Sequence, residues 1–125
     1  MSLRGSCLCK AVCYEVDQLD MPIGHCHCVT CRKAHAAAFA STAGVMRDQF
    51  RWTAGEEKLS AYESSPGKLR RFCSVCGTQL IAERPSQPHI ILRVATLRRM
   101  VCRKPHAAGA AERLRHHGRR RRDLG

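Results

Sequence analysis

Residues 25–33 read His25-Cys26-His27-Cys28-Val29-Thr30-Cys31-Arg32-Lys33, which places three cysteines and two histidines within seven residues. The C-x-C-x2-C spacing brings three thiolates to one point, one fewer than a closed tetrahedral zinc site requires. In extended backbone, alternate side chains share a face, so Cys26 and Cys28 point one way and the two histidines the other. The stretch therefore predicts a zinc ion held by Cys26, Cys28 and Cys31, with one open coordination position.

The segment that follows this cluster favours a short helix. From Cys31 onward it is rich in alanine, the strongest helix former. Cys31 and His35 are four residues apart and would share one face of that helix. His35 is therefore the histidine expected nearest the metal or its substrate, although a routine position on the helix surface remains the alternative.

Four further cysteines form a second set. Cys7-x-Cys9 lies near the start of the chain, and Cys73-x2-Cys76-Gly77 has the form of a zinc knuckle. Two such pairs supply the four ligands of a closed structural site. The binding energy of a metal at such a site is folding energy, because the site does not exist in the unfolded chain. The sequence thus predicts two Zn²⁺ ions per chain.

Zinc is preferred over disulfides on grounds of compartment. The chain begins without an apolar signal segment, and it has no apolar run of the roughly 18 residues that a membrane span needs. We expect a cytoplasmic protein, and in a reducing cytosol nine cysteines in 125 residues indicate metal binding. A disulfide scaffold is the alternative.

The remaining pattern predicts a mainly β fold in one domain. Val12, Tyr14 and Val16 alternate with polar or small residues, as in a strand with one buried face. Residues 59–63 and 89–94 are further strand candidates, and Ser64-Ser65-Pro66-Gly67-Lys68 is a turn that presents Lys68.

Charge divides the chain in two. Residues 1–97 carry 12 Lys and Arg against 8 Asp and Glu, whereas residues 98–125 carry 10 against 2. Most of the net charge of +12 therefore belongs to the last 28 residues, which are Arg-rich and lack apolar periodicity. We expect residues 98–125 to be a disordered basic tail, outside the folded domain of residues 1–97.

The cysteine motifs and the glycines around them resemble one known family. Gly5-Ser6-Cys7-x-Cys9, His25-Cys26-x-Cys28-x2-Cys31-Arg32, Trp52-x2-Gly55 and Ser65-Pro66-Gly67-x4-Phe72-Cys73-x2-Cys76-Gly77 are similar to the motifs of glutathione-dependent formaldehyde-activating enzymes and centromere protein V. The resemblance covers about residues 3–97. It implies an Mss4-like zinc-binding β fold with a structural zinc on the four-cysteine set and a catalytic zinc on the three-cysteine set.

The C-terminus departs from that family. Members usually continue with further strands that carry aromatic residues, and nothing after residue 97 resembles them. A shifted reading frame or a divergent end would account for the Arg-rich composition of residues 98–125. We therefore expect the C-terminal part of the family's fold to be missing from this chain.

The resemblance and the open zinc position together suggest carbon–sulfur lyase chemistry on a glutathione adduct such as S-hydroxymethylglutathione. Arg32, Lys33 and Lys68 are candidates to offset the charge of a zinc-bound thiolate or to hold a peptide carboxylate. The alternative is a non-enzymatic zinc module that binds nucleic acid or protein. The basic tail favours that alternative, but residues 1–97 carry a net charge of only +4.

Overall fold

A computed structural model describes residues 2–98 of the chain. These residues form nine strands and one α-helix, which confirms the prediction of a mainly β protein with a short helix. The basic tail predicted for residues 98–125 lies almost wholly outside the described residues. The elements in chain order are β1 (Leu3–Ser6), β2 (Cys13–Val16), β3 (Gly24–Cys26), α1 (Val29–His35), β4 (Ala40–Met46), β5 (Phe50–Ala54), β6 (Leu59–Ser65), β7 (Lys68–Cys73), β8 (Gln79–Glu83) and β9 (His89–Arg93).

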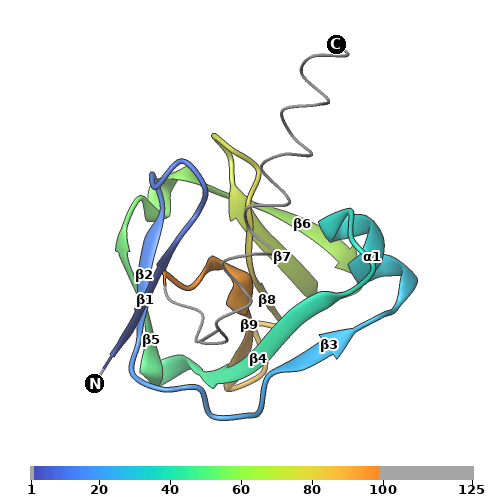
Figure 1. Ribbon diagram of the computed structural model, residues 1–125, viewed down its shortest axis with the longest axis horizontal. Coiled ribbons are helices and arrows are strands. Elements are labelled where there is room, and N and C mark those ends of the chain that lie inside the picture. The colour runs from blue at the N-terminus through green and yellow to red at the C-terminus, as the bar shows by residue number, and fades with distance from the viewer. Residues whose placement is uncertain (1, 99–125) are drawn as a thin grey trace, which may run out of the picture.

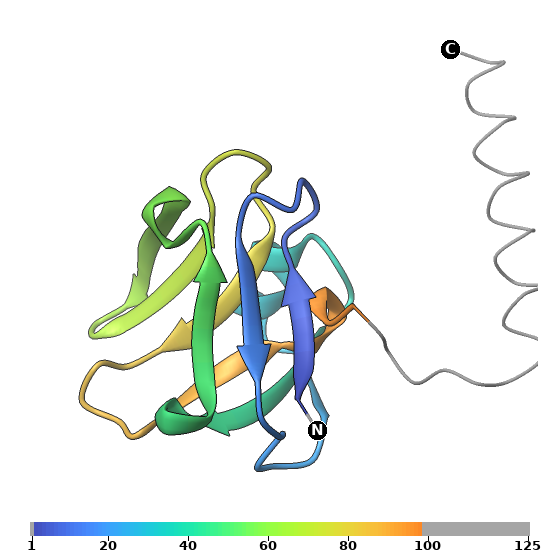
Figure 2. The same ribbon diagram turned by 90° about the vertical axis from the view of Figure 1, so that its left-hand side faces the viewer.

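The strands make two antiparallel sheets. The smaller has the order β1-β2-β5, and the larger has the order β3-β4-β9-β8-β7-β6. Figure 2 shows the three-stranded sheet standing in front of the larger one. Helix α1 lies on the side away from the small sheet, near β4 and β6 (Figure 1). The larger sheet therefore has one face toward the small sheet and another toward the helix.

The hydrophobic core lies between the two sheets. The alternation predicted around Tyr14 is confirmed, because Val12, Tyr14 and Val16 are all buried. The Tyr14 ring stacks on Phe50 at 5.3 Å and meets the edge of Trp52 at 6.3 Å between centroids. Its hydroxyl lies 2.6 Å from the Thr96 hydroxyl, so the buried phenol has a hydrogen-bond partner. The large sheet contributes Val45, Ile81, Ile90 and Leu92 to the same hydrophobic core.

The strand register assigns residues to the opposite face of the large sheet. Cross-strand partners share a face. The pairs Tyr62–Arg70, Arg70–Ala82 and Ala82–Ile91 therefore share one face, and Arg93 joins it two residues beyond Ile91. This face, toward α1, carries Arg70 and Arg93, whereas the other face carries mainly aliphatic side chains together with the paired Arg71 and Glu83.

The helix begins two residues earlier than predicted and ends before the alanine run. Cys28 caps its start, since its sulfur accepts a hydrogen bond from the Cys31 backbone N–H. Ala36 adopts a left-handed conformation, and its N–H bonds back to the carbonyls of Arg32 and Lys33. The Cys28 cap therefore sets where the helix starts, and the alanines at positions 36–38 do not extend it.

No helix among residues 2–98 is long and apolar enough to cross a bilayer.

A buried carboxylate joins β8 to its neighbours on the core side of the large sheet. Glu83 is 8% exposed and accepts hydrogen bonds from Arg47 (2.6 Å) and Arg71. Burial alone would raise the pKa of Glu83, but the two guanidinium groups hold it below its usual range. Because the folded-state pKa is lower than the unfolded one, this pairing stabilises the fold above about pH 4.5 and is lost as the pH falls.

We predict that Glu83→Gln lowers the free energy of unfolding by about 2 kcal/mol at pH 7. The loss is smaller than the roughly 3–5 kcal/mol of a fully buried pair because both arginines are about one-third exposed. Urea unfolding at several pH values measures it, with the exposed Glu57→Gln as control. A difference between wild type and Glu83→Gln that does not shrink below pH 4.5 would contradict the account.

Candidate metal centres

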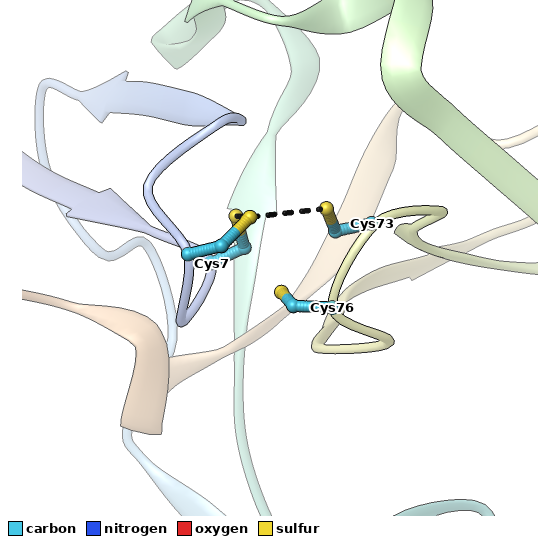
Figure 3. A group of neighbouring side chains, drawn as sticks. Cys7, Cys73 and Cys76 are labelled. Carbon is cyan, nitrogen blue, oxygen red and sulfur yellow. Dashed lines mark hydrogen bonds between the residues drawn. The ribbon is translucent and has the colours of Figure 1, made fainter.

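The structure brings Cys7, Cys9, Cys73 and Cys76 into one cluster. Cys7 and Cys9 lie in the turn after β1, Cys73 is the last residue of β7, and Cys76 lies in the turn that follows. All four sulfurs are within 4.8 Å of one another. Figure 3 shows Cys7 on one loop facing Cys73 and Cys76 on the other. The cluster joins segments that are more than 60 residues apart in sequence.

The spacing of these sulfurs fits a tetrahedral zinc ion. Zinc–sulfur bonds of about 2.3 Å at tetrahedral angles place neighbouring sulfurs about 3.8 Å apart. The Cys7–Cys9 and Cys9–Cys73 sulfurs are 3.6 and 3.9 Å apart. Four thiolates at this spacing are the ligand set of a closed structural zinc site.

Hydrogen bonds from the surrounding loops stabilise thiolates at this cluster. The backbone N–H groups of Val12 and Val75 donate to the sulfurs of Cys7 and Cys73, at 3.3 and 3.4 Å. The Thr78 hydroxyl accepts from the Leu8 N–H at 3.0 Å and lies 3.2 Å from the Cys76 sulfur, so that it can donate to a Cys76 thiolate. Mainly through Thr78, the pKa of Cys76 falls to about 5. Thr78 therefore links the two ligand loops and holds one ligand ionised.

Cys26, Cys28 and Cys31 form the second cluster. Cys26 ends β3, Cys28 caps α1, and Cys31 lies in the helix's first turn. The three sulfurs are within 4.8 Å of one another, and those of Cys26 and Cys28 are 3.5 Å apart. The Cys31 backbone N–H is the largest cause that lowers the pKa of Cys28, to about 7. This spacing fits the same metal geometry with one ligand fewer.

Burial differs across this second cluster. Cys31 is buried, Cys26 is half-buried and Cys28 is exposed. The cluster therefore lies at the surface, with its deepest sulfur against the protein and its shallowest toward solvent. The two histidines of the motif face elsewhere: the rings of His25 and His27 lie 4.5 and 5.2 Å from the Phe39 ring. His25 Nδ1 also lies 3.1 Å from the Ser41 hydroxyl.

A groove of about 440 Å³ adjoins the three-cysteine cluster. Helix α1 forms one wall, and strands β6, β7 and β8 form the other. Its polar centre is Arg70, whose Nη2 donates to the Cys31 sulfur at 3.7 Å and whose Nε donates to the Ser64 hydroxyl at 2.8 Å. Exposed Val29 and Tyr62 flank it. The groove is lined by Val29, Thr30, Lys33, Ala34, Tyr62, Ser64, Arg70 and Gln79.

Only one of the four candidate binding residues taken from the sequence lines the groove. Lys33 lines the groove. His35 is half-buried on α1, and its Nε2 has no hydrogen-bond partner within residues 2–98. Burial lowers the pKa of His35, and the charges of Arg93 and Arg70 lower it further. Arg32 is exposed on α1, Lys68 is half-buried at the start of β7, and neither lines the groove.

Sequence reasoning missed Arg70 and Arg93. Both are 4% exposed, although arginine is rarely so buried without a partner. Arg93 ends β9 and lies on the same face of the large sheet as Arg70. Burial lowers the pKa of Arg93 and the nearby Arg70 lowers it further, while the three cysteines raise it. The sequence holds one weak signal for Arg70. Lys68 and Phe72, the residues two positions away that share its strand face, offer no carboxylate with which it could pair.

Comparison with known proteins agrees with this arrangement. The family model described as "Glutathione-dependent formaldehyde-activating enzyme" matches residues 2–112. The chain belongs to this family. The match extends beyond residue 97, where the recognisable sequence motifs end. A crystal structure of a Rhodobacter sphaeroides protein is also similar, with 27% identity and a TM-score of 0.64 over 85% of this chain and 94% of that one.

We predict that Thr78→Val lowers the zinc affinity of the four-cysteine cluster by about 10-fold. The substitution preserves shape but removes the hydroxyl that donates to Cys76 and accepts from Leu8. Competition with a chromophoric chelator measures zinc release, and Thr53→Val, at an exposed strand position, is the matched control. Equal zinc retention in the two variants would show that the hydroxyl does not support the site.

Proposed function

We propose that this chain is a zinc-dependent enzyme of the carbon–sulfur lyase type, acting on an adduct of glutathione or another thiol such as S-hydroxymethylglutathione. One observation carries the proposal: a surface cluster of three cysteines, one ligand short of a closed site, adjoins a groove with a buried arginine. The groove's volume lies within the roughly 300–1,000 Å³ of small-molecule sites. Membership of the family supports the same chemistry.

The charge around the cluster supports a thiolate as the missing ligand. Three thiolates and a divalent ion leave one negative charge, and a fourth thiolate makes it two. Arg70, whose Nη2 lies 3.7 Å from the Cys31 sulfur, and Arg93, on the same sheet face, are both buried and supply two positive charges. Opposite charges such as those of Arg70 and the buried Cys31 thiolate, 3.7 Å apart, attract each other more strongly than they would in bulk water. The site is therefore balanced for three cysteines plus one further thiolate.

The reaction joins or separates a thiol and an aldehyde. In the forward direction a carbon–sulfur bond forms between the thiol and the carbonyl carbon, and the thiol proton ends on the carbonyl oxygen. In reverse that bond breaks and releases both partners. Zinc, when bound at the cluster, supplies the Lewis acidity that keeps a thiol ionised at neutral pH. The chain's own contribution is to hold the thiolate between Cys31 and the groove and to balance its charge with Arg70.

We predict that Cys28→Ala reduces bound zinc from two to about one per chain and abolishes glutathione binding. Cys28 supplies one of three ligands, and two are too few to hold the ion tightly. Zinc analysis and calorimetric titration measure the two effects. Cys13→Ala is the matched control because Cys13 belongs to neither cluster, and S-methylglutathione is the matched ligand without a thiol.

Two results would count against the proposal. Glutathione binding that persists unchanged in Cys28→Ala would separate the thiol site from this cluster. No glutathione binding to the zinc-loaded wild type would remove the substrate class.

Catalysis itself is tested by exchange. We predict that the zinc-loaded wild type accelerates exchange of ¹³C-formaldehyde between its free form and its glutathione adduct, followed by NMR. Cys28→Ala should return the exchange rate to that of the buffer, whereas Cys13→Ala should not change it. Equal rates with and without the wild-type protein, under conditions where glutathione binds, would make the chain a thiol-binding protein and not a lyase.

A further inference from the structure

Two exposed apolar side chains lie on opposite walls of the groove beside the three-cysteine cluster. Tyr62, on β6, is 66% exposed, and Val29, at the start of α1, is 55% exposed. Neither is needed by the sulfur chemistry proposed above. Apolar surface that a ligand removes from water contributes to its affinity. A ligand that fills the groove would cover both side chains.

The strand wall leaves the Tyr62 ring uncovered. Strand β6 is an edge strand of the larger sheet, and the pairing of Tyr62 with Arg70 places the ring on the face toward α1. Ser60 and Ser64, two positions away on either side, are too short to cover an aromatic ring. The Arg70 guanidinium is bonded to the Ser64 hydroxyl and to the Cys31 sulfur. The ring is therefore open to the groove.

The helix wall leaves space opposite that ring. Val29 and Lys33, and likewise Thr30 and Ala34, are four residues apart, so these two pairs form the face of α1 that lines the groove. Thr30 and Ala34 are short, and the groove has a volume of about 440 Å³. Formaldehyde adds only one carbon and one oxygen to a thiol and would fill little of this space. A larger group fits between Tyr62 and the helix.

The charge of the groove favours an apolar group in that space over a cationic one. Its charged lining residues are Lys33 and Arg70, and within residues 2–98 no carboxylate lines it. An ammonium group there would meet two like charges and find no acidic partner. A flat apolar group needs no partner, and it can pack against the Tyr62 ring in the arrangements that aromatic pairs prefer.

We infer that the groove holds an aromatic group attached close to the reacting carbon–sulfur bond, and that the substrates of the three-cysteine site are adducts in which the thiol or the aldehyde carries such a group. This inference rests on the function proposed above and specifies its substrate class. Tyr62 is the specificity-determining residue, and Val29 and Ala34 form the opposite wall.

Three thiols that differ in the attached group test the inference on the zinc-loaded full-length protein: 2-phenylethanethiol, 1-propanethiol and cysteamine, which carries an ammonium group at neutral pH. Calorimetric titration of the wild type should give at least 10-fold tighter binding of 2-phenylethanethiol than of 1-propanethiol. Cysteamine should bind more weakly than 1-propanethiol. A wild type that binds 1-propanethiol or cysteamine as tightly as the aromatic thiol would overturn the inference.

Substitution of Tyr62 tests the contact itself. Tyr62→Ala should weaken the binding of 2-phenylethanethiol about 10-fold and leave that of 1-propanethiol within 2-fold. Tyr62→Phe keeps the ring and should bind both thiols as the wild type does. The control is Ile23→Ala, which removes an apolar side chain that is 49% exposed and lies outside the groove lining. An equal loss for both thiols in Tyr62→Ala would show damage to the sulfur site and would overturn the inference.

A second variant fills the groove from the helix wall. Ala34 is half-buried and lines the groove, and leucine is also a strong helix former. Ala34→Leu should weaken the binding of 2-phenylethanethiol and spare that of 1-propanethiol. Unchanged binding of the aromatic thiol in both Tyr62→Ala and Ala34→Leu would show that it does not enter the groove.

Exchange measurements identify which partner carries the aromatic group. The NMR experiment proposed for formaldehyde is repeated with ¹³C-phenylacetaldehyde and glutathione. Slower exchange in Tyr62→Ala with phenylacetaldehyde, but not with formaldehyde, assigns the group to the aldehyde. An effect of Tyr62→Ala on thiol binding alone assigns it to the thiol.

Failure of the inference is distinct from failure of the proposed function. If all three thiols bind with equal affinity and Tyr62→Ala changes none of them, the aromatic substrate class is wrong and the thiol site stands. If none of the thiols binds to the zinc-loaded wild type, the proposed function is wrong and the inference falls with it.

Discussion

Four cysteine sulfurs held within 4.8 Å of one another are the constraint on which the rest of this structure depends. Ionised thiols at that distance would repel one another, and a cation bound between them would stabilise the arrangement. A zinc ion held by all four sulfurs would tie the turn after β1 to the end of β7 and the turn that follows it, and so hold the three-stranded sheet against the six-stranded one. Metal binding at this cluster would add folding energy to that of the hydrophobic core between the sheets.

The two faces of the six-stranded sheet carry different kinds of side chain. The face toward the small sheet is aliphatic, and its one buried carboxylate, Glu83, is paired on both sides. The face toward α1 carries unpaired polar groups on Arg70, Arg93 and His35. The buried aliphatic residues of the first face stabilise the fold, whereas the second face carries buried polar atoms without hydrogen-bond partners among residues 2–98. The three-cysteine cluster stands at the edge of that second face, where β3 gives way to the helix.

Much of this was predictable from the sequence, because cysteine spacing is a local signal. The spacings alone predicted that Cys7, Cys9, Cys73 and Cys76 would group apart from Cys26, Cys28 and Cys31. Alternation around Tyr14 predicted a half-buried strand. The buried arginines were not predictable from the sequence. Arg70 and Arg93 share a face only because of the register in which β7, β8 and β9 pair, and the sequence of a single strand does not specify that register. The helix start was also missed, because a cysteine took the capping role that Ser, Thr, Asp or Asn usually fills.

The central claim is that the three-cysteine cluster holds zinc with a position left for a substrate thiol. X-ray absorption at the zinc edge tests it directly, because it counts sulfur neighbours per metal. Two zinc ions with four and three cysteine ligands give an average of about 3.5 sulfurs, and saturation with glutathione should raise it to about 4. An average that stays near 3.5 when glutathione is bound would contradict the account.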